Sequence, residues 1–254
     1  SGVFSGFFGI TLGPLISGFL AGVEWRLVPL LLSGYSLVVG ILGRVILGGL
    51  ASSHKKGHMN TVLQQIRHTA MNRNIAMLGA AGFLSFFTFQ GMQPLISDMF
   101  SLPPFLMRKD EIGIILSIAG LVGILFSFAG GILADKIGFK KNMAVGFLGM
   151  LSPMFLLVLA DSYWSCLILL SAMNGFSQLA MTSRNALVVD LKPEVRGTVS
   201  SISNFLVFLG FASAPIALTP IYVTLGMGWV YLTNGFLLSL CVVFTVLIRP
   251  NPRT

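Results

Sequence analysis

The sequence predicts an all-α integral membrane protein, a helical bundle with eight transmembrane helices. Of its 254 residues, 55% are hydrophobic and only 9% are charged, whereas soluble domains carry about 25% charged residues. Its apolar runs reach the length of about 20 residues that crosses a bilayer as a helix. A closed barrel is the other structure that can span lipid, but it would show shorter segments of alternating polarity.

Eight apolar runs define the expected helices, and most connections between them are short, which favours antiparallel neighbours. The long connection covers residues 51–74, where Met59, Val62, Leu63 and Ile66 recur at helical spacing. We expect a short amphipathic helix there, lying on the inner membrane surface. The eight expected spans are 3–22, 27–50, 75–97, 112–133, 143–160, 165–187, 198–221 and 230–248.

Lys and Arg are distributed unequally between the two sides of the expected bundle. Because successive spans alternate in direction, eleven of the sixteen fall in connections on one side and three on the other. The positive-inside rule makes the basic side cytoplasmic, so we expect both chain ends there, in the plasma membrane. The net charge of +8 is thus a topology signal and not a nucleic-acid interface. The eleven are Lys55, Lys56, Arg67, Arg73, Lys136, Lys140, Lys141, Lys192, Arg196, Arg249 and Arg253, and the three are Arg26, Arg108 and Lys109.

The sequence has no pattern typical of a metal, cofactor or enzyme site. Cys166 and Cys241 lie singly in apolar runs, as expected of packed thiols. His54 and His58 form an i, i+4 pair, but no carboxylate or cysteine completes a metal site. A phosphate-binding loop and a nucleophile motif are also missing from the sequence. We therefore expect no metal, no cofactor, no enzymatic activity and no ATP-driven pump.

The first and seventh spans share a pattern. Parallel six-helix repeats occur in transporters, so we expect a parent chain of twelve spans, of which these are the last eight. Residues 1–50 would be the last two helices of the N-terminal half, 51–74 a cytoplasmic central loop, and 75–254 a complete six-helix C-terminal half. At an offset of 201 residues, Phe4, Phe7, Gly9 and Pro14 match Phe205, Phe208, Gly210 and Pro215.

The loop between the fourth and fifth spans reads GGILADKIGFKK, residues 130–141. It resembles motif A of the major facilitator superfamily, Gly-x-Leu-x-Asp-(Arg/Lys)-x-Gly-(Arg/Lys)-(Arg/Lys), with Phe139 departing at the first closing basic position. The resemblance extends over the whole chain and implies a secondary transporter whose two halves open alternately. The matching residues are Gly131, Leu133, Asp135, Lys136, Gly138, Lys140 and Lys141.

In this motif Gly138 allows the sharp turn between two successive spans. Asp135 is expected to attract a helix N-terminus from the other half and so to hold the cytoplasmic face closed. The alternative is a solvated loop that is anchored only by its charges.

The first span resembles a second pattern of the superfamily, motif C, Gly-x-x-x-Gly-Pro-x-x-Gly-Gly. The resemblance implies an exporter, in particular a proton-driven drug antiporter, because the motif is associated with these members. Small residues at i, i+4 and i+8 also form a helix-packing face, and both interpretations can hold together. The residues concerned are Gly9, Gly13, Pro14, Ser17 and Gly18, with Ser17 replacing one glycine.

The loop between the sixth and seventh spans is also similar to the superfamily. Pro193 ends one helix, and Arg196 opens the next. We expect Arg184, Asp190 and Arg196 to form a charge cluster at the inner face, with Arg184 or Asp190 pairing with Arg196 or Asp135. Such an exposed pair contributes only about 0–1 kcal/mol, which suits a latch that must open.

The polar groups within the spans are amides and hydroxyls, and no span carries a carboxylate near its middle. In the superfamily, the helices matching spans three, six and seven line or border the cavity. Aromatic faces with a few amides suit amphipathic molecules, although the amides can equally cross-link helices. The expected cavity residues are Phe86, Phe89, Gln90, Gln93, Asn174, Gln178, Asn204 and Phe208.

Together these patterns predict a proton-coupled exporter of small amphipathic compounds that works as a monomer in the lipid bilayer. The alternatives are an uptake carrier for a sugar or organic acid, and a transport-inactive truncated membrane protein. No basic pocket for an anionic substrate is expected.

Overall fold

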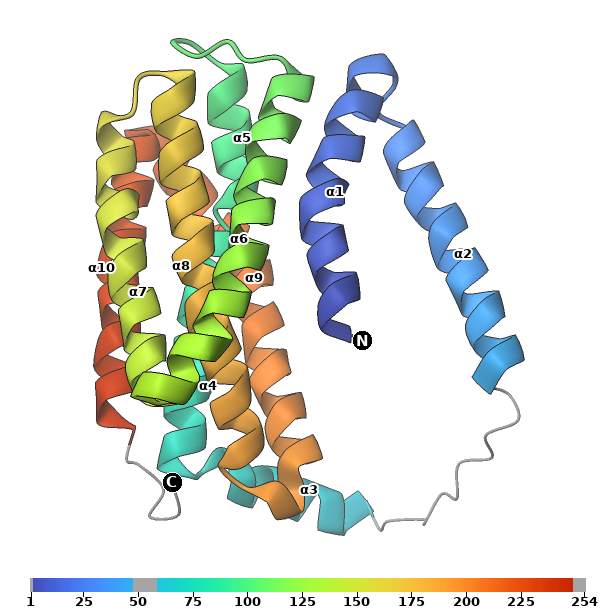
Figure 1. Ribbon diagram of the computed structural model, residues 1–254, viewed down its shortest axis with the longest axis vertical. Helices are drawn as coiled ribbons and strands as arrows, with labels where there is room; N and C mark the ends of the chain where they lie inside the picture. The colour runs from blue at the N-terminus through green and yellow to red at the C-terminus, as the bar shows by residue number, and fades with distance from the viewer. Residues whose placement is uncertain (1, 48–58, 249–254) are drawn as a thin grey trace.

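The computed structural model describes residues 2–47 and 59–248, and no β-strand occurs among them (Figure 1). The prediction of an all-α membrane bundle is confirmed. The helical elements are α1 (Gly2–Val23), α2 (Leu27–Leu47), α3 (Met59–Ala70), α4 (Arg73–Ser85), η1 (Phe86–Gln90), α5 (Gln93–Ser101), α6 (Lys109–Ile137), α7 (Phe139–Leu156), η2 (Leu157–Leu159), α8 (Tyr163–Asp190), η3 (Pro193–Val195), α9 (Arg196–Leu225) and α10 (Met227–Leu247).

Seven helical segments within the described residues are long and apolar enough to cross a membrane. The helix α1, with 22 residues, lies at the first expected span. Successive connections lie at opposite ends of the bundle, as expected for antiparallel neighbours (Figure 1). The seven segments are Leu27–Ile46, Arg73–Ser101, Lys109–Ile137, Phe139–Leu159, Tyr163–Asp190, Arg196–Leu225 and Met227–Leu247.

The third expected span, 75–97, lies within the membrane-length segment Arg73–Ser101, but this segment is not one regular helix. The helix α4 passes into the π-helical turn η1, in which the N–H of Gly91 donates to the carbonyl of Phe86 five residues back, at 2.8 Å. A new helix, α5, begins at Gln93 with Pro94 in its first turn, where a missing N–H costs nothing. Single π-turns inside α-helices are frequent at functional sites.

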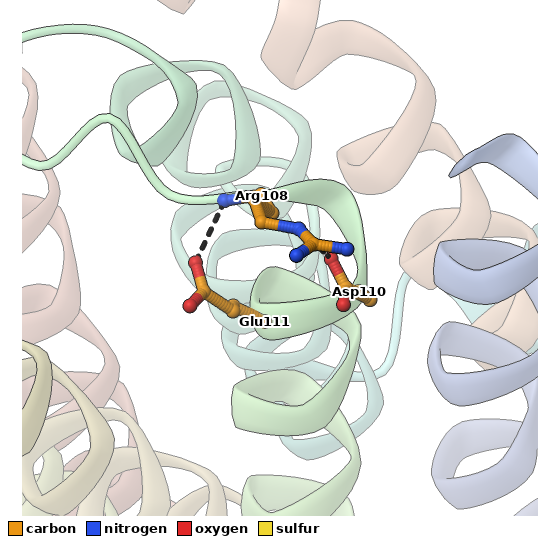
Figure 2. Close-up of polar contacts among 3 residues, drawn as sticks. All are labelled: Arg108, Asp110 and Glu111. Carbon is orange, nitrogen blue, oxygen red and sulfur yellow. Dashed lines mark hydrogen bonds and ion pairs between the residues drawn. The ribbon is translucent and has the colours of Figure 1, made fainter.

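Charged residues extend α6 beyond the apolar run 112–133. Its first turn is fixed by Glu111, whose carboxylate accepts a hydrogen bond from the N–H of Arg108 at 2.8 Å, and by the ion pair of Arg108 with Asp110 at 3.1 Å (Figure 2). Carboxylates are favoured at a helix N-terminus because they complement the dipole. The apolar run therefore defines the membrane core of the helix but not its ends.

Six membrane segments pack into one bundle, in which α8 lies against α6 and α7, and α4 lies against α9 and α10. Glycines permit the closest approaches. A Cβ on Gly210 of α9 would clash with the carbonyl oxygen of Phe83 in α4, and a Cβ on Gly146 of α7 would clash with Ala180 of α8. Small residues bring helices together in lipid because packing replaces the hydrophobic effect there.

The first two helices stand beside this bundle (Figure 1). The helix α1 packs on α6, and α2 contacts α1. No residue in the membrane-length window of α2 is buried, and most are exposed, as expected of a helix whose apolar residues face lipid.

The amphipathic helix expected in the long connection is present as α3, and it packs on α9. It ends just before Asn72, whose side chain caps α4 by accepting from the N–H groups of Asn74 and Ile75 at 3.1 and 3.3 Å. His54 and His58 lie outside the described residues.

Candidate functional site

A cavity of about 290 Å³ lies among α4, η1, α8 and α9. Six of the eight residues expected to form a cavity line it: Phe86, Phe89, Gln90, Gln178, Asn204 and Phe208. The remaining lining residues were not expected, and they are Ser85, Ser177, Met181, Arg184, Asn185 and Val207.

Two expected cavity residues lie elsewhere. Gln93 begins α5, beyond the π-helical turn. Asn174 packs against Gly123, where its Oδ1 would lie 2.9 Å from an added Cβ, and it serves the contact between α8 and α6. Its Oδ1 is buried without a hydrogen-bond partner among the described residues.

The π-helical turn positions three of the lining residues. Phe86, Phe89 and Gln90 belong to η1, which packs on α9. Gly91 permits this contact because a Cβ there would clash with Ala214 of α9. The extra residue in the turn therefore brings two aromatic rings and an amide to the cavity from one short stretch of chain.

Arg184 is not part of the expected inner-face charge cluster. Its side chain is 2% exposed, whereas Asp190 and Arg196 are both exposed. The guanidinium instead donates from Nε to the carbonyl of Leu78 at 3.2 Å and from Nη2 to the hydroxyl and carbonyl of Ser203. It thereby joins α8 to α4 and α9 and forms part of the cavity wall.

A signal for this burial was present in the sequence. Arg184 precedes the end of α8 by six residues, which is roughly 9 Å along a helix axis at 1.5 Å per residue. A charge so far inside a membrane helix is costly and faces protein or a water-filled cavity. Placing Arg184 in one cluster with Asp190 and Arg196, because they are near it in sequence, overlooked its depth in the membrane helix.

In the motif A-like loop, Gly138 has φ +88° and joins α6 directly to α7. This left-handed conformation favours glycine, which agrees with the turn expected from the motif. Gly131 is half-buried, and Asp135, Lys136 and Lys141 are exposed.

Lys140 and Asn142 fix the start of α7 to neighbouring helices. Lys140 donates to the carbonyl of Ile248 at the end of α10. The fully buried Asn142 donates to the carbonyl of Gly130 at 2.9 Å and to the hydroxyl of Ser183 at 2.6 Å. The loop is thus tied to α6, α8 and α10.

The motif C-like residues contribute to the contact between α1 and α6. An added Cβ on Gly18 would lie 2.8 Å from the carbonyl oxygen of Lys109, and one on Gly113 would lie 2.7 Å from that of Pro14. Ser17 donates to the carbonyl of Pro14 at 3.2 Å. Gly13 faces open space instead, and the surroundings of Gly9 lie outside the described side chains.

Two comparisons with known proteins bear on this arrangement. A family model described as Major Facilitator Superfamily matches residues 78–254. A search of the curated proteins finds no match. The matched range is more than half of the chain, and it contains every residue that lines the cavity.

Proposed function

Since the chain belongs to the major facilitator superfamily, whose members are secondary transporters, we propose that it exports small amphipathic molecules by alternating access in exchange for protons. The cavity among α4, η1, α8 and α9 is the proposed binding site. The single observation that carries this proposal is the convergence of Phe86, Phe89, Phe208 and four amide side chains on that cavity.

The composition of the cavity wall supports an amphipathic substrate. Rings supply apolar contact area, and Gln90, Gln178 and Asn204 supply donors and acceptors that orient a polar group. The volume of about 290 Å³ is near the lower end of the usual range of about 300–1,000 Å³ for small-molecule sites. A compound with one aromatic ring and a short chain suits a cavity of this size.

The proposed gate is the motif A-like loop at the basic end of the bundle, which we assign to the cytoplasmic side of the plasma membrane. Asp135 is exposed there and available to a helix N-terminus from the other half of the transporter. Lys140 and Asn142 hold the start of α7 to its own half. Opening would then separate Asp135 from its partner without disturbing the six-helix bundle.

Export and proton coupling are proposed from the motif C-like segment. The close approach of Gly18 to Gly113 supports a role for this segment in packing α1 on α6. The residue that carries the proton is expected outside the spans described above, and we expect the transporter to act as a monomer.

Uptake of an organic acid by the same cycle is the second candidate. The buried guanidinium of Arg184 on the cavity wall favours an acid over a sugar.

Proteoliposomes test the export proposal. Vesicles containing the protein are loaded with radiolabelled aromatic acids, amides and amines, and release is followed with and without an imposed proton gradient. We expect at least one compound to leave faster when protons flow in the opposite direction. Release that does not change when an ionophore collapses the gradient would contradict proton exchange, and absence of any protein-dependent release would contradict transport through this chain.

A further inference from the structure

We propose that the cavity among α4, η1, α8 and α9 selects amphipathic anions, and that the guanidinium of Arg184 binds the carboxylate of the substrate. This inference rests on the proposed function because it names the substrate class for the same cavity. The apolar part of the substrate would lie against Phe86 and Phe208, which line the same cavity.

The charge of Arg184 is unbalanced within the described residues. It is the only charged side chain among them that lines the cavity, and it forms no ion pair with any of them. Its four hydrogen-bond acceptors are neutral groups on Leu78, Asn185 and Ser203. These contacts satisfy N–H groups but bring no negative charge.

One donor of the guanidinium is left over. A guanidinium has five N–H groups, and the contacts with Leu78, Ser203 and Asn185 account for four of them. The fifth is on Nη1, which contacts the Oδ1 of Asn185 at 3.3 Å. Asn185 also lines the cavity, so the Nη1 that carries this donor contacts a residue of the cavity wall.

A purely structural cross-link does not explain why the side chain is charged. Removing a charge from water is costly unless a partner charge is present, and neutral side chains often replace buried ionic groups without loss of stability. A ligand that carries the opposite charge accounts for both the burial and the positive charge.

The surrounding helices are shaped around the guanidinium. It lies against Gly82 of α4, where a Cβ would clash with it. Leu78 and Gly82 are four residues apart and thus on one face of α4. The substitution Gly82→Ala therefore displaces the charged group without removing it.

Equilibrium binding to the purified full chain in lipid nanodiscs tests the proposal. The probes are 4-phenylbutyrate, 4-phenylbutyramide and 4-phenylbutylamine, which share one apolar body and differ in charge, and empty nanodiscs correct for partition into lipid. We expect the acid to bind on the order of tenfold more tightly than the amide, as one charged hydrogen bond allows, and the amine to bind most weakly.

Variants locate the origin of the preference. Arg184→Gln should bind the acid and the amide equally, and Gly82→Ala should reduce the preference. Arg196→Gln is the matched control, since Arg196 is exposed at the start of α9, and it should keep the full preference. A preference for the acid that survives in Arg184→Gln would overturn the assignment.

Other outcomes separate this inference from the proposed function. Equal binding of the acid and the amide by the wild-type chain overturns the anion proposal even if Arg184→Gln does not fold. Phe208→Ala should weaken the binding of all three probes about equally. Phe205→Ala is its control and should leave binding unchanged, because Phe205 lies outside the cavity and its side chain is 65% exposed, against 66% for Phe208. If Phe208→Ala leaves the binding of all three probes unchanged, the cavity is the wrong site and both proposals fail. If Phe208→Ala weakens the binding of all three, but the wild-type chain binds the acid and the amide equally, only the anion proposal fails.

Discussion

Lys140 caps the last turn of α10 through Ile248: its Nζ lies 2.6 Å from the carbonyl oxygen of Ile248 and also donates to the carbonyl of Val246 at 2.9 Å. A cation at this position satisfies carbonyl groups that lack partners within the helix and complements the negative end of the dipole. Lys140, which contributes to the charge asymmetry that indicates the topology, thus also joins the start of α7 to the end of α10.

We expect Lys140→Met to lower the free energy of unfolding by about 1–2 kcal/mol, because a charged hydrogen bond and a dipole interaction are lost together. Denaturant titration in mixed micelles measures this change. Lys141→Met is the control, since Lys141 is its exposed neighbour and should have little effect. Equal losses in the two variants would show that the cap contributes no stability.

Gly18→Ala should weaken the packing of α1 on α6. The new methyl group would lie 2.8 Å from the backbone oxygen of Lys109, and overpacking of this kind costs about 1–3 kcal/mol. Gly13→Ala is a control on the same helix, because nothing lies within 4 Å of its added Cβ and alanine favours the helix by about 1 kcal/mol. Thermal unfolding should therefore shift down for Gly18→Ala and stay or rise for Gly13→Ala. The reverse order would contradict the close contact.

Asp135→Asn should slow transport more than it weakens substrate binding, if the carboxylate holds the cytoplasmic face closed as proposed. In the proposed gate this charge acts between the two halves, and Asp135 is not among the residues that line the cavity. Turnover in proteoliposomes and equilibrium binding in nanodiscs separate the two effects. Asp161→Asn serves as the control, since Asp161 is exposed in the connection between η2 and α8. A variant with weakened binding and normal turnover would refute the gate.

Asn142 and Ser183 should be energetically coupled. The Nδ2 of Asn142 lies 2.6 Å from the hydroxyl oxygen of Ser183, and both side chains are fully buried. A double-mutant cycle of Asn142→Ala and Ser183→Ala should give an interaction free energy of about 0.5–2 kcal/mol. Strictly additive losses would mean that the two side chains do not stabilise each other.

The helices could be predicted from the sequence because lipid imposes a strong and local constraint. An apolar run of sufficient length in lipid has to be helical, and all eight expected runs contain helices. The turn at Gly138 was also accessible, since the motif places a glycine where two helices meet.

The site was only partly accessible. Phe89, Gln178 and Asn204 were identified by polarity and ring content, which are properties of single residues. Arg184 was assigned to the inner-face charge cluster because it was grouped with nearby charges and its depth in α8 was overlooked. Its hydrogen-bond partners on α4 and α9 could not be predicted from the sequence. Those contacts join residues more than a hundred positions apart in one case, and no local pattern contains them.

The π-helical turn η1 has a consequence for how such chains diverge. Each residue of an α-helix turns the chain by about 100°, so one extra residue in Phe86–Gln90 changes the register between the two parts of the span. This change separates Gln93 from Gln90, which would share a face of a regular helix. In a related chain that lacks one residue of this turn, different side chains would face the cavity although the rest of the sequence is the same. A single deletion could therefore change substrate selectivity without substitution of any lining residue.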